Sequence, residues 1–157
     1  MLLELNHGLV TQFDECDEEL VMSRKWLAYK NSRNTWYVRS RIGSSTTFLI
    51  LSRLLLNAPD EMVVDHIDGD GLNNARANLR LCTPRQNSQN RRKGKSGSSQ
   101  FKGVVAHRGK WRAQIRYSGK LYVLGRFEDE MEAAREYNSA ARIYFGEFAR
   151  LNEIGNV

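Results

Sequence analysis

The sequence of 157 residues is poor in cysteine, in proline and in long apolar runs. Its two cysteines, Cys16 and Cys82, lack the paired spacing of a disulfide framework or a zinc site, so we expect reduced thiols that serve packing. No stretch approaches the roughly twenty apolar residues of a membrane span. The N-terminus also lacks the basic start and apolar run of a secretory signal. We therefore expect a cytoplasmic protein without a membrane partner.

Acidic residues are missing from Gly71 to Phe127. Residues 65–127 hold fourteen Lys and Arg against three Asp, whereas acids outnumber bases in residues 1–64 and in residues 128–157. A basic span of this length suits a phosphate backbone. The alternative, a merely solvated face, would normally include Glu and Asp. The charge pattern therefore predicts double-stranded DNA as the partner.

Residues 63–90 form the most informative segment. An apolar, β-branched run at residues 62–64 predicts a short strand that ends at Asp65 and His66. The Asp- and Gly-rich residues 67–71 predict a reversal of the chain, and residues 79–82 a second strand. Thr83, Pro84 and Gln86 then supply the N-cap, first position and capping-box partner of a helix. Two strands and a helix of this kind would bring Asp65 close to Asn87.

The residue types in this segment suit metal-assisted hydrolysis. Asp65 and Asn87 offer hard oxygen ligands, which favour Mg²⁺ or Mn²⁺ over Zn²⁺. His66 can accept a proton from an attacking water near neutral pH. Asn78 is placed to hold the loop and to orient His66. The alternative is an Asp- and Asn-rich loop with an incidental histidine.

This segment resembles the HNH endonuclease family, in the ββα-metal variant whose last histidine is replaced by asparagine. The resemblance implies that Asp65 and Asn87 bind the metal, that His66 is the general base and that Asn78 braces the loop. It extends upstream through Lys25-Trp26, residues 36–39 and residues 51–57. Ser52 is a departure, because many relatives carry histidine at this position.

The chain is predicted to contain two domains. Residues 1–92 form the first, with its ββα core at about residues 62–92, and residues 101–157 form the second. The linker, residues 93–100, is rich in Gly and Ser. Four basic side chains at the linker are expected to bind DNA as a flexible strap. They are Arg91, Arg92, Lys93 and Lys95. The alternative is that this span is a passive tether.

Beyond the linker the pattern predicts a three-stranded meander over residues 101–107, 110–117 and 120–125, with Gly-containing turns. Asp129 is expected to cap a following helix, with Glu132 three residues later. Along the central strand Trp111, Ala113, Ile115 and Tyr117 face one way, toward the helix. The other face is left for a DNA groove and carries Lys110, Arg112, Gln114 and Arg116.

Residues 98–152 resemble the ethylene-response-factor (Apetala-two) DNA-binding family, through Phe101-Lys102-Gly103-Val104, residues 109–116 and residues 124–127. In that family the sheet reads the major groove. The resemblance implies DNA contacts by Lys102, Arg108, Arg112, Gln114 and Arg116. Val105, Leu121 and Val123 depart from the arginine and tryptophan of plant members, so plant target specificity is not carried over. The alternative is a sheet without a DNA role.

Together the two parts predict an α+β protein that resembles homing-type HNH endonucleases of phages and bacteria. The expected activity is metal-dependent nicking of duplex DNA at a preferred site, in a bacterial or phage-infected cell. With one active site per chain, the protein could act as a monomer or as a DNA-bound dimer, and the sequence leaves both alternatives open. The main alternative is a sequence-specific DNA-binding regulator with an inactive HNH module, and a restriction or defence nuclease is the third possibility.

Overall fold

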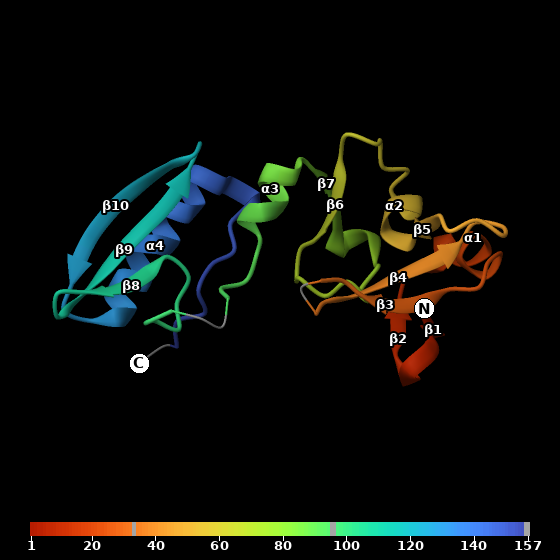
Figure 1. The fold of residues 1–157 in the computed structure, drawn as a ribbon, viewed down its shortest axis with the longest axis horizontal. Helices are drawn as coiled ribbons and strands as arrows, with labels where there is room; N and C mark the ends of the chain where they lie inside the picture. Colours follow the sequence, from red (N-terminus) through yellow and green to blue (C-terminus); the bar gives the residue numbers. More distant parts are fainter. Residues whose placement is uncertain (33, 95–96, 156–157) are drawn as a thin grey trace. The chain divides into compact units, whose positions relative to one another are not determined.

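The computed structural model describes residues 1–32, 34–94 and 97–155. The chain divides into two compact units, residues 1–87 and residues 88–157. Within the described residues the strands form four small antiparallel sheets, accompanied by short helices and one long helix (Figure 1). This confirms the predicted mixture of helix and sheet. No helix in the described ranges is both long and apolar enough to cross a membrane.

The first unit begins with two small sheets. Strands β1 (Leu2–Glu4) and β2 (Val10–Gln12) pair around the 3-10 helix η1 (Asn6–Gly8), and the second sheet has the order β3-β4-β5. The remaining elements of this part are η2 (Glu15–Asp17), α1 (Glu18–Met22), β3 (Leu27–Lys30), β4 (Trp36–Arg41), β5 (Phe48–Ile50) and α2 (Leu51–Leu55). The predicted β-rich N-terminal segment is therefore present.

The core of the first unit gathers apolar side chains from β1, α1, β4, β5 and α2. Its fully buried members include Phe13, Val21, Val38 and Leu51, and Leu79 joins them from the segment predicted to carry chemistry. Trp26 is buried as well, and its indole Nε1 donates to the Val21 carbonyl at 2.7 Å, which satisfies its polar atom. Because Leu79 belongs to this core, the motif is anchored to the N-terminal sheets.

The motif folds as a strand pair followed by a helix. Strand β6 (Val63–His66) pairs antiparallel with β7 (Leu79–Cys82), and between them lies the 3-10 helix η3 (Arg76–Asn78). Helix α3 (Pro84–Gln89) follows directly. Thr83 and Gln86 form the predicted capping box, since the Gln86 amide donates to Thr83 Oγ1 at 3.2 Å and the Thr83 amide donates to Gln86 Oε1 at 2.8 Å.

The second unit contains the predicted meander and helix. Strands β8 (Val104–His107), β9 (Lys110–Tyr117) and β10 (Lys120–Phe127) form one sheet with β9 in the centre, and α4 (Glu130–Phe145) packs on one face (Figure 1). Asp129 caps α4, because its side chain accepts from the Glu132 amide at 2.9 Å. A last 3-10 turn, η4 (Gly146–Phe148), follows.

Strand β8 begins at Val104 and not at the predicted residue 101. The chain turns at Gly103, whose φ is +76°, and a Cβ there would lie 1.9 Å from the Tyr137 ring of α4. Only glycine permits this conformation and this close approach. The turn is therefore shaped by packing on the helix, which local strand propensity does not report.

The alternation predicted for the central strand is confirmed. Ala113 and Ile115 are buried against α4, with Trp111 and Tyr117 packed beside them. The helix face differs in part from the predicted stripe of Met131, Ala134, Tyr137 or Asn138, Ala141 and Tyr144. The residues of α4 that are buried are Ala133, Ala134, Tyr137, Asn138, Ala140, Ala141 and Phe145, whereas Met131 and Tyr144 are half-buried at the edges.

Candidate functional site

Asp65 lies near the C-terminal end of β6 and is 4% exposed. The strand register places Asp65 directly opposite Arg80 of β7, and side chains of such a pair share one face. Arg80 donates to Asp65 Oδ2 from Nε at 2.9 Å and from Nη2 at 2.7 Å. The buried carboxylate is thus compensated by a half-buried guanidinium, an arrangement that avoids the cost of an isolated charge.

The sequence reasoning missed Arg80. A signal was available, because an antiparallel pairing of residues 63–66 with residues 79–82 already places position 80 opposite position 65. The prediction treated the two strands as carriers of ligands and did not work out their register.

His66 follows Asp65 and is 6% exposed. Its Nε2 lies 3.3 Å from Asn74 Oδ1, and the edge of its ring faces Tyr37 at 5.7 Å between centroids. Burial lowers the pKa of His66, more than the Asn74 contact and the nearby Asp carboxylates raise it. The imidazole is therefore neutral at neutral pH, which is the state that a general base requires.

The contacts of Asn74 determine which nitrogen of His66 carries the proton. Asn74 is 1% exposed, and its Nδ2 donates to Thr11 Oγ1 at 2.9 Å while Thr11 Oγ1 donates to the Leu72 carbonyl at 2.7 Å. Since the Asn74 amide nitrogen is used in this way, its oxygen is the acceptor for His66 Nε2–H. We infer that Nδ1 is the basic nitrogen of His66.

Strand β2 thereby supports the histidine from far away in the sequence. The Gln12 amide donates to the Leu72 carbonyl at 3.0 Å, and the Asn74 amide donates to the Gln12 carbonyl at 2.8 Å. Gly71, in the same loop, lies so close to β4 that a Cβ would be 2.3 Å from the Trp36 carbonyl oxygen. The N-terminal sheets therefore fix the loop that positions His66.

Asn78 holds the loop between β6 and β7 through its side-chain hydrogen bonds. Its Oδ1 accepts from the Asp68 amide at 3.1 Å, and its Nδ2 donates to Asp68 Oδ1 at 3.0 Å and to the Asn73 carbonyl at 2.8 Å. The Asn78 carbonyl also accepts from the Ile67 amide at 2.9 Å, one residue beyond His66. Through this residue the loop is tied to the end of β6.

Asp68 is the first of the two acids in the loop between β6 and β7, and its role is structural. Burial alone would raise the pKa of Asp68, but the Asp70 amide and the side chains of Asn73 and Asn78 donate to its carboxylate and bring its pKa below the usual value. The donor atoms lie 2.8–3.0 Å from the carboxylate oxygens. A carboxylate with this many donors is held in place.

Asn87 lies in the first turn of α3 and is half-buried, and its amide donates to the Thr83 carbonyl at 3.0 Å. Cys82 connects it with Asp65. Burial and the charge of Asp65 raise the pKa of the Cys82 thiol to about 11, while a hydrogen bond with the Asn87 backbone acts in the opposite direction. Asp65 and the backbone of Asn87 therefore both act on the Cys82 thiol, and Cys82 is itself a buried packing residue.

Within the described residues, no three side chains of His, Cys, Asp or Glu gather so as to hold a metal ion. A divalent ion would therefore depend on mixed oxygen donors. The carboxylate of Asp65 and the amide of Asn87 have the chemistry that Mg²⁺ or Mn²⁺ prefers. Arg80 is the one feature of the site that opposes such an ion, because its positive charge already engages Oδ2 of Asp65.

A family model described as HNH endonuclease matches residues 57–89. Two relatives match a longer part. An uncharacterized HNH endonuclease of Acanthamoeba polyphaga mimivirus is 42% identical over 97 residues, 61% of this chain and 50% of that protein. Protein 3.8 of Escherichia phage T7 is 37% identical over 94 residues, 59% of this chain and 77% of that protein. The chain belongs to the HNH endonuclease family.

This HNH chain spans about half the length of the mimivirus relative. APETALA2-like protein 2 of Oryza sativa subsp. indica is 46% identical to it over 59 residues, 36% of this chain and 14% of the plant protein. That match is short, so it gives weak support to the predicted ethylene-response-factor resemblance. No solved structure matches the chain.

In the second unit of the HNH chain, the sheet face away from α4 carries the predicted strand residues. Arg112, Gln114 and Arg116 lie on it, and cross-strand register adds Arg126, Val123 and Leu121 opposite them. Arg116 is exposed, whereas Arg112 and Gln114 are half-buried. Among the described residues, Arg112 Nε and Gln114 Oε1 have no hydrogen-bond partner. Arg126 was not among the predicted contacts, because it lies in β10 and the alternation was predicted for β9.

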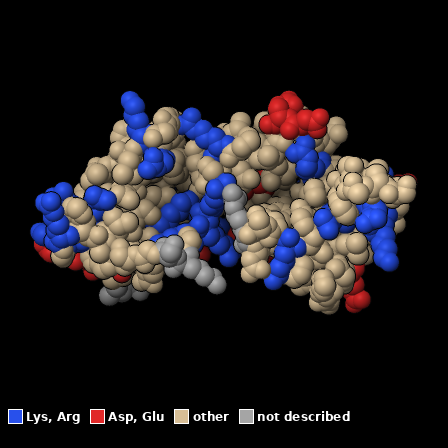
Figure 2. Space-filling view, in the orientation of Figure 1, with Lys and Arg blue, Asp and Glu red and all other residues tan. Residues whose placement is uncertain are grey.

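The apolar residues on this face are exposed. Leu121 and Val123 are 47% and 55% exposed, although they lie beside basic side chains. Figure 2 shows Lys and Arg spread over the visible surface of the second unit, with Asp and Glu confined to its lower margin. The face therefore combines positive charge with small apolar contacts, as base readout in a DNA groove requires.

Lys110 begins β9 on the same alternating row and pairs with Glu128 at 2.5 Å. The remaining predicted DNA contacts lie outside this strand, and Arg108 is exposed in the turn before β9 with a φ of +53°. Lys102 is in the turn before β8, and its Nζ donates to the Gln89 carbonyl. Arg91 and Arg92 are exposed and Lys93 is half-buried. Lys95 lies outside the described residues.

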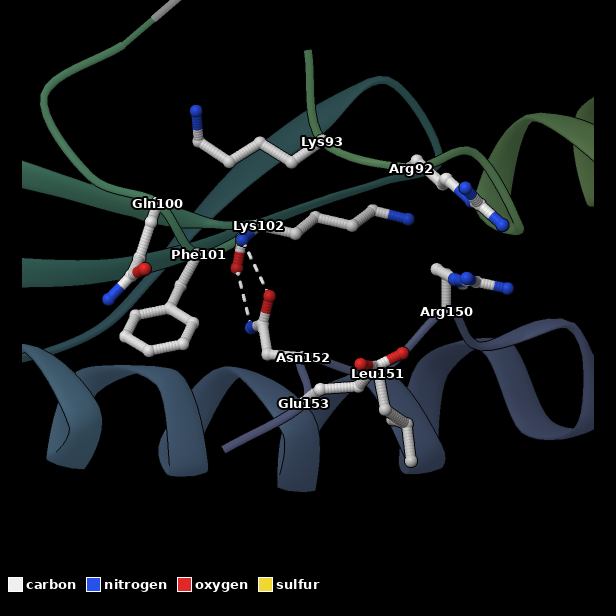
Figure 3. A pocket seen from close by; sticks show the side chains of 9 residues that line it. All are labelled: Arg92, Lys93, Gln100, Phe101, Lys102, Arg150, Leu151, Asn152 and Glu153. Carbon is white, nitrogen blue, oxygen red and sulfur yellow. Dashed lines mark hydrogen bonds between the residues drawn. The ribbon is translucent and has the colours of Figure 1, made fainter. Parts of the chain in front are cut away.

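Lys102 opens onto a pocket of about 220 Å³ in the second unit, here called the basic pocket (Figure 3). Its charged and polar lining comes from Arg92, Lys93, Gln100, Lys102, Arg150, Asn152 and Glu153. Burial, Arg150 and Arg91 lower the pKa of Lys102 to about 8. Neither Arg150 nor the pocket was predicted, because the pocket joins three segments that are distant in the sequence.

Proposed function

We propose that this chain is a metal-dependent DNA endonuclease that hydrolyses phosphodiester bonds. The observation that carries the proposal is the end of β6, where a buried, neutral His66 and a buried Asp65 lie side by side in the segment that matches the HNH family. The module is a ββα-metal site formed by β6, β7 and α3. A neutral histidine next to a hard oxygen ligand is suited to activate water beside a phosphate.

The residues of the site have separate tasks. Asp65 and Asn87 would hold the divalent ion, Mg²⁺ or Mn²⁺. The chemistry that such an ion would supply when bound is polarisation of the phosphate and stabilisation of the leaving 3′ oxygen. His66 takes the proton of the attacking water on Nδ1, and the Asn74 oxygen stabilises the resulting imidazolium at Nε2. Asn78 keeps the loop closed, so that the imidazole stays in one orientation.

The second unit supplies the preference for a site on duplex DNA. Arg116, Arg112 and Gln114 on the exposed sheet face read base edges, and the basic residues 91–93 contact the backbone. Arginine pairs with guanine and glutamine with adenine in the major groove. This division of work is that of a homing-type nuclease, and one site per chain makes a nick the product of a single encounter.

The proposal is tested with supercoiled plasmid, Mg²⁺ or EDTA, and the variant His66→Ala. We expect wild type to form open circles with Mg²⁺ and not with EDTA, and His66→Ala to bind the plasmid without cutting it. The control is His7→Asn, which changes a histidine outside the site to a residue that tolerates its φ of +63°. Equal cutting by His66→Ala and wild type would overturn the assignment of the base.

A DNA-binding regulator with an inactive HNH module is the second candidate. One observation favours it: Arg80 engages Asp65, the residue assigned to the metal. Under this alternative the plasmid is retarded in a gel and stays supercoiled with both Mg²⁺ and Mn²⁺, while Arg80→Met restores metal binding without restoring cleavage.

A further inference from the structure

The basic pocket brings three cationic side chains to one end. In Figure 3 the side chains of Arg92, Lys102 and Arg150 point toward the same region, whereas Lys93 extends away from them. They come from three segments: Arg92 follows α3, Lys102 precedes β8 and Arg150 follows η4. Like charges that converge in a hollow raise the energy of the protein alone, and an anion between them lowers it.

Lys102 is fixed at its backbone. Its amide donates to Asn152 Oδ1 at 2.6 Å, and Asn152 Nδ2 donates to its carbonyl at 3.0 Å (Figure 3). Asn152 is held in turn by Asn138 of α4, through hydrogen bonds of 2.7 Å and 3.0 Å. Asn138 is 7% exposed. The base of the pocket is thus a chain of paired amides, which gives the site a fixed shape before any ligand arrives.

The size and the donors of the pocket suit a phosphate group. At about 220 Å³ it is smaller than the roughly 300–1,000 Å³ of pockets that enclose drug-sized ligands. Two guanidinium groups and an ammonium supply charge-assisted donors, and the arginines can bind phosphate oxygens in bidentate fashion. Glu153 is the single acid of the lining, so the pocket keeps a positive balance.

We propose that Arg92, Lys102 and Arg150 form a binding site for one phosphate of the nucleic-acid backbone. This inference rests on the proposed function and extends it, because Arg150 lies off the sheet face assigned to base reading. The site is independent of base sequence and fixes the position of the second unit on DNA, while the sheet residues read the bases. Burial, Arg150 and Arg91 lower the pKa of Lys102 to about 8, and a bound phosphate would raise that pKa again.

The test compares Arg150→Met and Lys102→Met with a matched control, Lys120→Met, which removes an exposed lysine of the same unit. Affinity for a duplex oligonucleotide is measured in EDTA as a function of salt, so that cleavage does not interfere. We expect each pocket variant to bind about tenfold more weakly, as for the loss of a charge-assisted hydrogen bond. The loss of DNA affinity in the double variant should be smaller than the product of the two single losses, because both residues bind one phosphate. Lys120→Met should stay within about twofold, because an exposed surface charge contributes little.

A second measurement keeps the inference separate from the nuclease proposal. Inorganic phosphate and dimethyl phosphate are titrated into the full chain, and the amide signals of Lys102 and the side-chain amide of Asn152 are followed by NMR. Saturable shifts in wild type that are lost in Arg150→Met support the site, even if the chain cuts no DNA. Arg150→Met is the safer variant, should Lys102→Met disturb the turn.

Three results would overturn the inference. Saturable binding of inorganic phosphate together with wild-type DNA affinity in both variants would assign the pocket to free phosphate and not to the backbone. The absence of any saturable shift, with DNA affinity unchanged in both variants, would remove the site and leave the nuclease proposal intact. If the loss of DNA affinity in the double variant equalled the product of the two single losses, Lys102 and Arg150 would contact different phosphates.

Discussion

Polar side chains are buried and interlocked in the first unit, but they are displayed on a surface in the second. Asp65, His66 and Asn74 are each less than a tenth exposed and bind one another or their neighbours in β2 and β7. On the sheet of the second unit, Arg116, Leu121 and Val123 are exposed. The comparison teaches that the proposed chemistry depends on fixed geometry, whereas DNA binding depends on the charge and shape of a surface. Single substitutions should therefore cause large losses of stability or cleavage rate in the first unit and small losses of DNA affinity in the second.

The largest expected effect on stability comes from Arg80→Met. The change leaves the buried carboxylate of Asp65 without its partner, and breaking such a pair costs about 3–5 kcal/mol. Because Mg²⁺ would then be the available counter-charge, it should raise the Tm of Arg80→Met more than the Tm of wild type. Thermal unfolding with and without Mg²⁺ measures both effects. An equal Mg²⁺ response in the two proteins would argue against Asp65 as a metal ligand.

A smaller loss is expected for Asn78→Ala. The substitution removes the side-chain hydrogen bonds to Asp68 and to the Asn73 carbonyl and should lower the free energy of unfolding by about 1–3 kcal/mol. Urea unfolding checks this value. A matched control is Asn31→Ala, another half-buried asparagine, whose Oδ1 accepts from the Thr35 amide at 3.1 Å in a turn of the same unit. Plasmid cutting should fall in Asn78→Ala alone.

The pH dependence of cutting should reflect the buried state of His66. Because burial lowers the pKa of His66, its neutral form persists below the ordinary value of about 6.5. The rate should be level from pH 7 upward and should fall about tenfold per pH unit only below the lowered pKa. Folding stability should also decline as the pH falls below 6.5, since the unfolded chain then binds the proton more readily. An acid limb centred above pH 6.5 would contradict this picture.

The smallest effect concerns the exposed apolar pair in the second unit. If Val123 contacts a thymine methyl group, replacing thymine by uracil in a selected duplex should weaken binding about fourfold, the equivalent of one buried methyl group. In Val123→Ala the same replacement should change nothing. The comparison is made by equilibrium binding in EDTA on matched duplexes. A uracil effect of equal size in both proteins would place the methyl contact elsewhere.

Local patterns predicted the local structure. The strand at residues 79–82, the capping box at Thr83, the N-cap at Asp129 and the face alternation of β9 all follow from interactions within a few residues, which periodicity and capping rules describe. The family also follows from residues 63–90. What the sequence did not reveal depends on contacts between distant segments. Thr11 supports Asn74 across 63 positions, and Lys102 meets Asn152 across 50. The predicted start of β8 was wrong for the same reason, since the turn at Gly103 before this strand is shaped by contact with Tyr137 of α4.

The most direct measurement determines cleavage rate and DNA affinity together for wild type and His66→Ala, on the same supercoiled plasmid. We predict a loss of at least about a hundredfold in the Mg²⁺-dependent rate, the lower range for a general base, with affinity in EDTA unchanged. Loss of both rate and affinity would show that His66 serves binding or folding. An unchanged rate would show that another group is the base and would overturn the role proposed for His66.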